Sequence, residues 1–194
     1  MNSSPRPAPS PDPVADPRGY QNHLLSLLGD DEPAAVQSAT SGALRKLVAE
    51  AGAGLRGRPA PGEWSVIECV GHILDAEVVC AARYRWILAH DAPTLIGYDQ
   101  DRWVARLRHA EADPDELLAT FEALRSANVA LWARTSGDER ARVGRHEERG
   151  PESFELTFRL IAGHDRFHLD QARRGLAAVG AGPGRGSSAG QTQP

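Results

Sequence analysis

Two histidines in the C-terminal part of the chain have the spacing of a metal chelate. His164 and His168 are four residues apart, and on an α-helix this offset places both imidazoles on one face, one turn apart. Leu160, Ile161 and Gln171 share that face, which carries no charged residue. Two neutral imidazoles held in this way can bind a divalent ion. The same spacing also suits two histidines that each make a separate hydrogen bond, so the pair alone leaves both interpretations open.

A third ligand has to come from earlier in the chain, where the histidines have unequal settings. His109 and His146 stand in strongly polar stretches, and we expect them to be solvated. His90 lies at the end of a predicted helix, where a positive charge interacts favourably with the helix dipole. His23 lies in a short leading segment. These four are therefore weak candidates for a shared metal site.

His72 is the best-placed third ligand. It lies deep in a long predicted helix, next to the apolar residues Ile73 and Leu74. A ligating imidazole usually donates its other ring N–H to a carboxylate or a carbonyl. Asp75, on the same predicted helix, and Gln171, on the last one, are the candidates for that role.

The elements that must position these side chains are predicted to be helices. Apolar residues recur with helical spacing over residues 33–52, 65–89, 115–135 and 152–179, after a short apolar segment at 20–28. Ser65 and Glu68 form a capping box at the start of the second long helix. The sequence therefore predicts four long amphipathic helices.

The segments between the helices contain turn residues. Two prolines and two glycines mark residues 56–62 as a loop, and residues 138–151 are polar and contain glycine and proline. β-Branched residues never alternate with a period of two, so we expect little or no sheet. The fold class is accordingly all-α, and four long helices in a chain of this length favour a four-helix bundle.

Composition divides the chain into one domain and two tails. Residues 1–17 hold six of the fourteen prolines, and residues 180–194 are rich in Gly, Ser and Gln. Both segments are expected to be disordered. Residues 18–179 then form a single domain of ordinary size.

Charge, hydropathy and cysteine content limit the function classes. A net charge of −4 argues against a dedicated nucleic-acid binder, and no apolar run approaches the roughly 18 residues of a membrane span. Cys69 and Cys80 are eleven residues apart on one predicted helix, about 16 Å of rise, too far to bridge each other. Cys69 could ligate a metal, but a small helical thiol is more typical of packing. We expect a cytoplasmic protein without nucleic-acid or membrane partners.

Two segments resemble motifs of a known family. In residues 62–77 a Trp-Ser pair opens the helix and His72 follows seven residues after the serine. This resembles the second-helix motif of the DinB/YfiT-like superfamily of metal-dependent proteins. Residues 162–171 resemble its last-helix motif, which supplies two more histidines and often a glutamine, and residues 98–103 fit its middle part. The resemblance covers about residues 20–175.

The resemblance implies a four-helix bundle of the DinB/YfiT-like type with a three-histidine site for Zn, Ni or Fe, open to water or substrate. The ligands correspond to His72, His164 and His168 in this sequence. Some members use a low-molecular-weight thiol in transferase or isomerase reactions, and members commonly form dimers. A small-molecule substrate and a homodimer are thus expected from the resemblance.

An open site with three neutral imidazoles would be a Lewis acid, because its ligands leave the positive charge of the ion uncompensated. It could activate water for attack on an ester or amide, or a thiol for transfer to an electrophile. The predicted function is a metal-dependent hydrolase or thiol S-transferase. The alternative is a metal-dependent binding or stress-response protein without turnover.

Two further interpretations of the histidines are weaker. A zincin-like protease uses H-E-x-x-H, in which the glutamate is the general base. Here Asp165 occupies that position, and the third histidine precedes the pair instead of following it. In the other interpretation the histidines are packed in the core and hold no metal.

The connection between the second and third long helices supplies candidates for the pocket wall, because loops of this kind often cover a bundle site. They are Tyr98, Asp99, Asp101, Arg102 and Trp103. A solvated surface pair is the alternative for Asp101 and Arg102, and core packing is the alternative for Trp103.

One acidic residue is predicted to be buried for structural reasons. Glu77 shares a helix side with apolar Val70 and Ile73, where a lone carboxylate would be costly. Arg125, on the third long helix, is its expected partner. Such a buried pair more often fixes a fold than performs chemistry.

Overall fold

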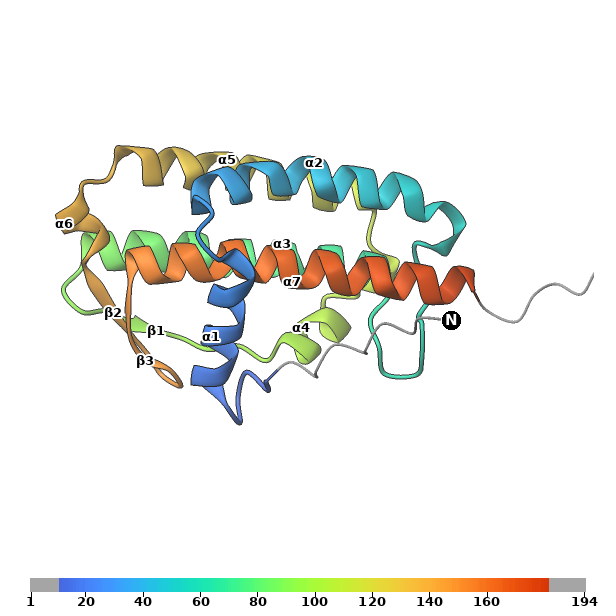
Figure 1. Ribbon diagram of the computed structural model, residues 1–194, viewed down its shortest axis with the longest axis horizontal. Helices are drawn as coiled ribbons and strands as arrows, with labels where there is room; N and C mark the ends of the chain where they lie inside the picture. Colours follow the sequence, from blue (N-terminus) through green and yellow to red (C-terminus); the bar gives the residue numbers. More distant parts are fainter. Residues whose placement is uncertain (1–10, 182–194) are drawn as a thin grey trace, which may run out of the picture.

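The computed structural model describes residues 11–181 and contains four long helices that run side by side (Figure 1). These are α2 (Pro33–Ala51), α3 (Val66–Ala89), α5 (Pro114–Arg134) and α7 (Phe154–Gly180). The shorter α1 (Pro17–Leu28) lies across the bundle and packs against α7. The predicted all-α four-helix bundle is confirmed.

The tails predicted to be disordered are residues 1–17 and 180–194, and of these residues 1–10 and 182–194 lie outside the described part of the chain. Within the described part, Asp16 caps α1 by accepting a hydrogen bond from the backbone N–H of Gly19. The helix begins at Pro17, in the first turn where the missing amide donor costs nothing. Residues 11–181 contain no helix long and apolar enough to cross a membrane.

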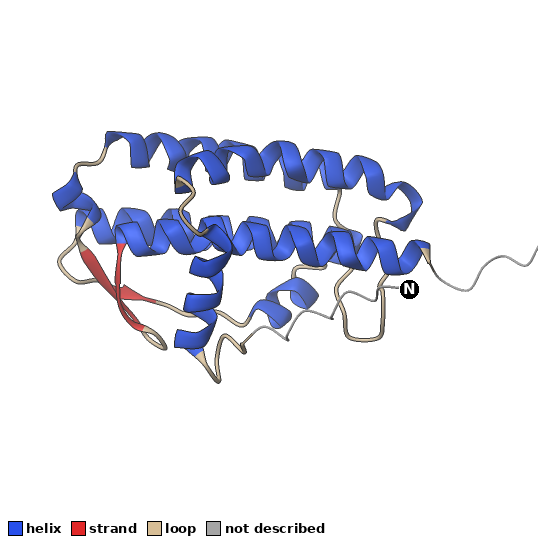
Figure 2. Cartoon of the chain, in the orientation of Figure 1, coloured by secondary structure: helices blue, strands red, loops and turns tan. Residues whose placement is uncertain are grey.

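Short elements connect the long helices (Figure 2). They are η1 (Gly52–Gly54), β1 (Thr94–Leu95), α4 (Gln100–Arg106), η2 (His109–Glu111), α6 (Gly137–Arg140), β2 (Val143–His146) and β3 (Gly150–Ser153). The strands form one small sheet in the order β1-β2-β3, in which β1 and β2 are parallel and β2 and β3 antiparallel. The polar stretch at 138–151 thus consists mostly of the end of α6 and the hairpin of β2 and β3.

The helix ends are fixed by local hydrogen bonds. The Ser65–Glu68 capping box is present at the start of α3, and acidic residues cap α2 and α5, each just before a proline in the first turn. Gly52 ends α2 with a positive φ of 46°, a conformation that glycine adopts without strain. The capping box fixes the N-cap of α3 at Ser65, seven residues before His72.

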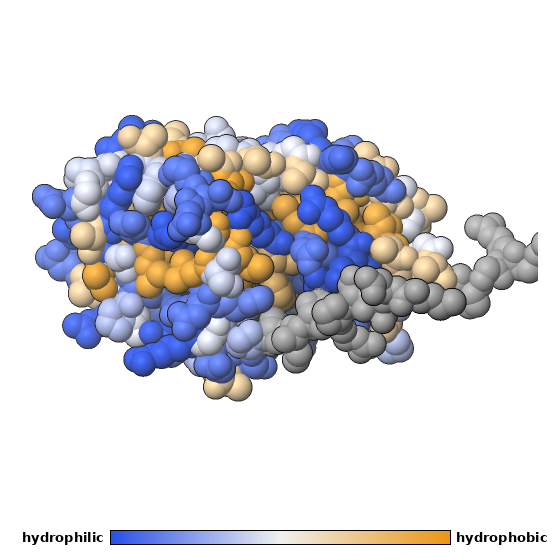
Figure 3. All heavy atoms as spheres, viewed as in Figure 1, coloured by the Kyte–Doolittle hydropathy of each residue, from blue (hydrophilic) through white to orange (hydrophobic). Residues whose placement is uncertain are grey.

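Apolar side chains fill the bundle as two clusters. One surrounds the first half of α3 and includes Leu44, Ile67 and Phe121. The other contains aromatic rings, among which Trp132 and Phe158 stack with centroids 4.2 Å apart. On the face drawn in Figure 3, apolar residues gather along the centre and hydrophilic ones surround them.

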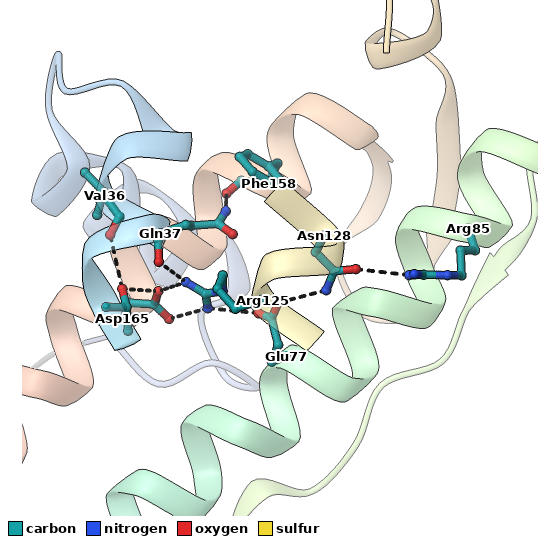
Figure 4. A network of polar contacts seen from close by, with 9 residues as sticks. Val36, Gln37, Glu77, Arg85, Arg125, Asn128, Phe158 and Asp165 are labelled. Atoms are coloured by element: carbon teal, nitrogen blue, oxygen red, sulfur yellow. Dashed lines mark hydrogen bonds and ion pairs between the residues drawn. The ribbon is translucent and has the colours of Figure 1, made fainter. Parts of the chain in front are cut away.

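A buried polar network links the four long helices (Figure 4). The predicted ion pair is confirmed: Arg125 Nη2 lies 2.8 Å from Glu77 Oε2. Arg125 also binds Asp165 of α7, whose Oδ2 accepts a hydrogen bond from Thr40 of α2 at 2.8 Å. Asn128 donates to Glu77 at 2.7 Å. The network thereby sets how α7 sits against α3, the two helices that carry the predicted ligands.

Candidate metal centre

Three histidines from two adjacent, antiparallel helices, α3 and α7, meet inside the bundle. The Nε2 atom of His72 lies 3.0 Å from Nε2 of His164 and 3.1 Å from Nε2 of His168. The three residues are 1%, 7% and 2% exposed, respectively. Their ligand atoms all lie within 4.8 Å of one another, so the three residues could hold a metal ion. The structure therefore brings together the residues that the sequence selected.

Burial keeps these imidazoles neutral. It lowers the pKa of His72 and His164 well below the ordinary value of histidine, and the neighbouring His168 contributes to both shifts. Burial also lowers the pKa of His168 to about 4, although its hydrogen bond with Gln171 acts in the opposite direction. A neutral imidazole is the form that binds a metal.

Gln171 orients one of the three rings, as expected. Its Oε1 lies 2.7 Å from Nδ1 of His168, and because an amide oxygen only accepts, Nδ1 carries the proton. The lone pair of His168 is then on Nε2, which faces the other two histidines. This is the hydrogen bond that commonly fixes the tautomer of a metal-ligating histidine.

Asp75 does not occupy the corresponding place beside His72. Its Oδ2 lies 2.7 Å from Nε2 of His109, and Nδ1 of His72 has no partner within residues 11–181. Gly71 makes room for this contact: it has no side chain, and an ideal Cβ there would lie 2.3 Å from Cγ of His109. Asp75 therefore anchors the α4–η2 connection to α3.

The expectation that His109 and His146 are solvated is wrong. They are 5% and 3% exposed. His146 lies on β2, where alternate residues are buried, and its Nε2 accepts a hydrogen bond from Arg83 at 3.0 Å. Their polar neighbours in sequence point to solvent while the histidines point inward.

The three nitrogens fit a divalent ion. Bonds of about 2.0–2.1 Å in a tetrahedral zinc site place the ligand nitrogens about 3.3 Å apart, close to the separations from His72. One proton on His72 would have to serve two neighbouring acceptors, whereas a cation satisfies three convergent lone pairs at once. The donor set, its protonation and its spacing all agree with metal binding.

Aromatic rings cover one side of the centre. The Trp64 ring stacks on His168 at 5.9 Å between centroids and lies 4.9 Å from the His72 ring. Phe167 contacts His168 edge-on at 4.8 Å. The sequence indicated Trp64 only as part of the family motif. Its position one residue before the N-cap Ser65 is the signal that places it beside the first turns of α3.

The other side of the centre opens into a cavity of about 490 Å³, to which His72 and His164 contribute. Tyr98, Asp99 and Asp101 line it, as proposed for the connection between the second and third long helices. The remaining two predicted wall residues, Arg102 and Trp103, line a separate depression next to Asp75.

Two groups close in sequence to the histidines play other roles. Asp165 is turned away into the network around Arg125, so it does not take the place of the zincin glutamate. Burial raises the pKa of both Cys69 and Cys80 to about 12. Both are therefore protonated thiols, and Cys69 packs in the apolar core.

Comparisons with known proteins agree with this geometry. A family model described as the DinB superfamily matches residues 35–172. Curated proteins of Bacillus cereus and Bacillus thuringiensis, named "Putative metal-dependent hydrolase", are 26% identical over 107 residues. The aligned part is 55% of this chain and 61% of theirs, so it spans less than two thirds of those relatives.

A solved structure has the same fold. It is that of YfiT from Bacillus subtilis, described as "a probable metal-dependent hydrolase with an unusual four-helix bundle topology". The TM-score is 0.69 with 19% identity, and the match covers 92% of this chain and 94% of that one.

Proposed function

Because the chain belongs to the DinB superfamily, we propose that His72, His164 and His168 hold one divalent metal ion, Zn, Ni or Fe. We further propose that the centre makes the protein a metal-dependent enzyme, a hydrolase or thiol S-transferase, that acts on a small molecule. The observation that carries this proposal is the convergence of three buried, neutral Nε2 atoms beside a cavity.

The chemistry follows from the donor set. When bound, an ion with three neutral ligands supplies Lewis acidity that makes water or a thiol nucleophilic near neutral pH. The residues of the chain create the conditions for it. Gln171 holds His168 in the required tautomer, Trp64 shields one side of the rings, and the cavity leaves the other side accessible.

The metal is tested by loading the full chain stoichiometrically and measuring bound metal after desalting. We expect about one equivalent in the wild type and its loss in His164→Ala. His90→Ala is the control, because His90 is an exposed histidine at the end of α3. A wild type that retains no metal, or a His164→Ala variant that retains a full equivalent, contradicts the proposed centre.

Turnover is tested separately on the loaded protein with ester substrates and with thiols paired with electrophiles. An activity that is absent from His72→Ala and present in His90→Ala supports an enzyme. Thermal stabilisation by one of these compounds without product would instead identify the alternative, a metal-dependent binding protein.

A further inference from the structure

The cavity beside the histidines contains a buried arginine that lacks a counter-ion. Arg83 is 5% exposed. Its Nη2 donates to the backbone carbonyl of Ile96 at 2.6 Å and to Nε2 of His146 at 3.0 Å, and its buried Nε has no hydrogen-bond partner. Within residues 11–181 no carboxylate oxygen lies within the 4.0 Å of an ion pair with Arg83. An unpaired buried charge is costly.

The other arginines in the interior of the described chain are paired. Arg125 has Glu77 and Asp165, and Arg149, which also lines the cavity, is paired with the buried Glu152. This leaves Arg83 as the uncompensated positive charge at its end of the cavity.

His146 does not neutralise Arg83. Burial, with the nearby charges of Arg149 and Arg83, lowers the pKa of His146 to about 4. The ring is neutral near pH 7 and acts only as a hydrogen-bond acceptor toward the guanidinium. The positive charge at this end of the cavity therefore remains.

The helical phase of Arg83 places it in line with the metal centre. It follows His72 by eleven residues on α3, which is about three turns, so both project from nearly the same face with about 16 Å of rise between them. Both residues line the same cavity.

The wall between the two ends is mostly apolar. Ala76 and Val79 of α3 and Leu160 and Ile161 of α7 line it, with Thr157 of α7 as a polar member. The cavity also has acidic lining residues, all of which are exposed to solvent: Asp12, Asp99, Asp101 and Glu148. A ligand that fills this space would meet the histidine centre, then apolar side chains, then a buried cation.

We propose that Arg83 binds the anionic group, a carboxylate or phosphate, of an elongated amphipathic small molecule whose other end lies at the three-histidine centre. The proposal names the substrate class of the site and in that respect rests on the proposed function. Arg83 lines the cavity and its guanidinium has a carboxylate partner nowhere within residues 11–181, so it can supply a charge-assisted hydrogen bond to an oxyanion. The bonds to Ile96 and His146 hold the guanidinium in place before the ligand arrives.

The test measures binding of octanoate, octyl phosphate and octanol to the full chain by calorimetry, in metal-free and metal-loaded forms. Binding of an anionic probe to the metal-free wild type should weaken about tenfold or more in Arg83→Gln. Binding of octanol should not change. Octanoate and octyl phosphate each contain eight carbon atoms, so their relative affinities identify the preferred oxyanion.

Two further variants make the result decisive. Arg145→Gln is the matched control, because Arg145 precedes His146 on β2 but is exposed, and it should bind like the wild type. Circular dichroism shows whether Arg83→Gln folds. If it does not, Arg83→Lys is the second variant: it keeps the charge and should retain part of the affinity of the wild type. Anionic probes that bind no better than octanol, or that bind Arg83→Gln and Arg83→Lys as tightly as the wild type, overturn the proposal.

The link to the metal is read from a second probe pair, suberic monohydroxamate and its methyl ester, because a hydroxamate chelates metal ions. Loading the wild type with metal should tighten binding of the free acid, and Arg83→Gln should remove the advantage of the acid over the ester. If anion binding depends on Arg83 but loading has no effect on the hydroxamate, the oxyanion site stands and the proposed metal centre fails.

Discussion

The single hydrogen bond between Gln171 and His168 decides which nitrogen of that ring faces the centre. The Nδ1 atoms of His72 and His164 have no such partner in the described chain. His168 is therefore the one ligand whose tautomer is fixed by a hydrogen bond within residues 11–181. A residue outside the ligand set thus determines how well the site is prepared for a cation.

Replacement of Gln171 by Leu should weaken metal affinity about 10–100-fold, the usual effect of removing an orienting partner. Competition with a chromogenic chelator measures this, with Arg173→Gln, an exposed neighbour on α7, as control. Equal affinity in wild type and Gln171→Leu would show that packing alone orients the ring.

The buried histidines also give stability a pH dependence whose sign can be worked out. The pKa of His146 falls from about 6.5 to about 4 on folding, mainly because of burial. The unfolded chain therefore binds more protons than the folded one between these values. The neutral, buried His146 therefore contributes fully to stability above pH 6.5, and this contribution is lost as the pH falls through about 4.

Urea unfolding of the metal-free protein should accordingly show a free energy of unfolding that decreases from pH 6.5 to pH 4. His146→Gln should have a smaller slope, because it removes one of the titrating groups, whereas the exposed His90→Gln should keep the slope of the wild type. An unchanged slope in His146→Gln would show that His146 is already neutral in the unfolded chain at these pH values or protonated in both states.

The packing of η2 against α3 depends on Gly71, which leaves room for the His109 ring. A Cβ there would stand 2.3 Å from the His109 ring, so Gly71→Ala must displace η2 and disturb the Asp75–His109 bond. We expect a loss of about 1–3 kcal/mol in unfolding free energy, measured by urea denaturation. Gly42→Ala, in the exposed middle of α2 with nothing within 4 Å, should instead stabilise by up to about 1 kcal/mol.

The helices were predictable and the packing of their connections was not. Apolar periodicity and caps are local signals, and they placed α3 at 65–89 against Val66–Ala89 observed. The burial of His109 depends on Gly71, 38 positions earlier. The burial of Arg83 and His146 depends on the pairing of β1 with β2, which are distant in sequence. Polar neighbours in sequence hid these contacts, although the eleven-residue interval from His72 to Arg83 was a readable helical phase.

Arg125 of α5 is buried and connects all four long helices of the bundle. It pairs with Glu77 of α3 and Asp165 of α7, and it donates to the backbone carbonyl of Gln37 of α2 at 3.1 Å. Although burial alone would lower the pKa of Arg125, Asp165 and Glu77 raise it above the ordinary value, so the guanidinium stays charged.

Arg125→Met leaves two buried carboxylates without their partner and should cost about 3–5 kcal/mol of unfolding free energy. Denaturant unfolding measures the loss. Arg134→Met, at the exposed end of the same helix, should stay within about 0.5 kcal/mol of the wild type. A small effect at Arg125 would mean that the carboxylates take up protons or find water when the arginine is removed.

A metal at the histidines would connect α3 and α7, as the Arg125 network also does, because His72 belongs to α3 while His164 and His168 belong to α7. An ion that binds only the folded chain stabilises it by mass action, by about 2.7 kcal/mol at a free concentration one hundred times the dissociation constant. Loading should therefore raise the Tm of the wild type, and a chelator should reverse the rise. In His164→Ala the metal-dependent rise should disappear even if the Tm of the metal-free form increases through relief of the crowding between the three rings. A rise of equal size in wild type and His164→Ala would place the stabilising ion elsewhere on the molecule.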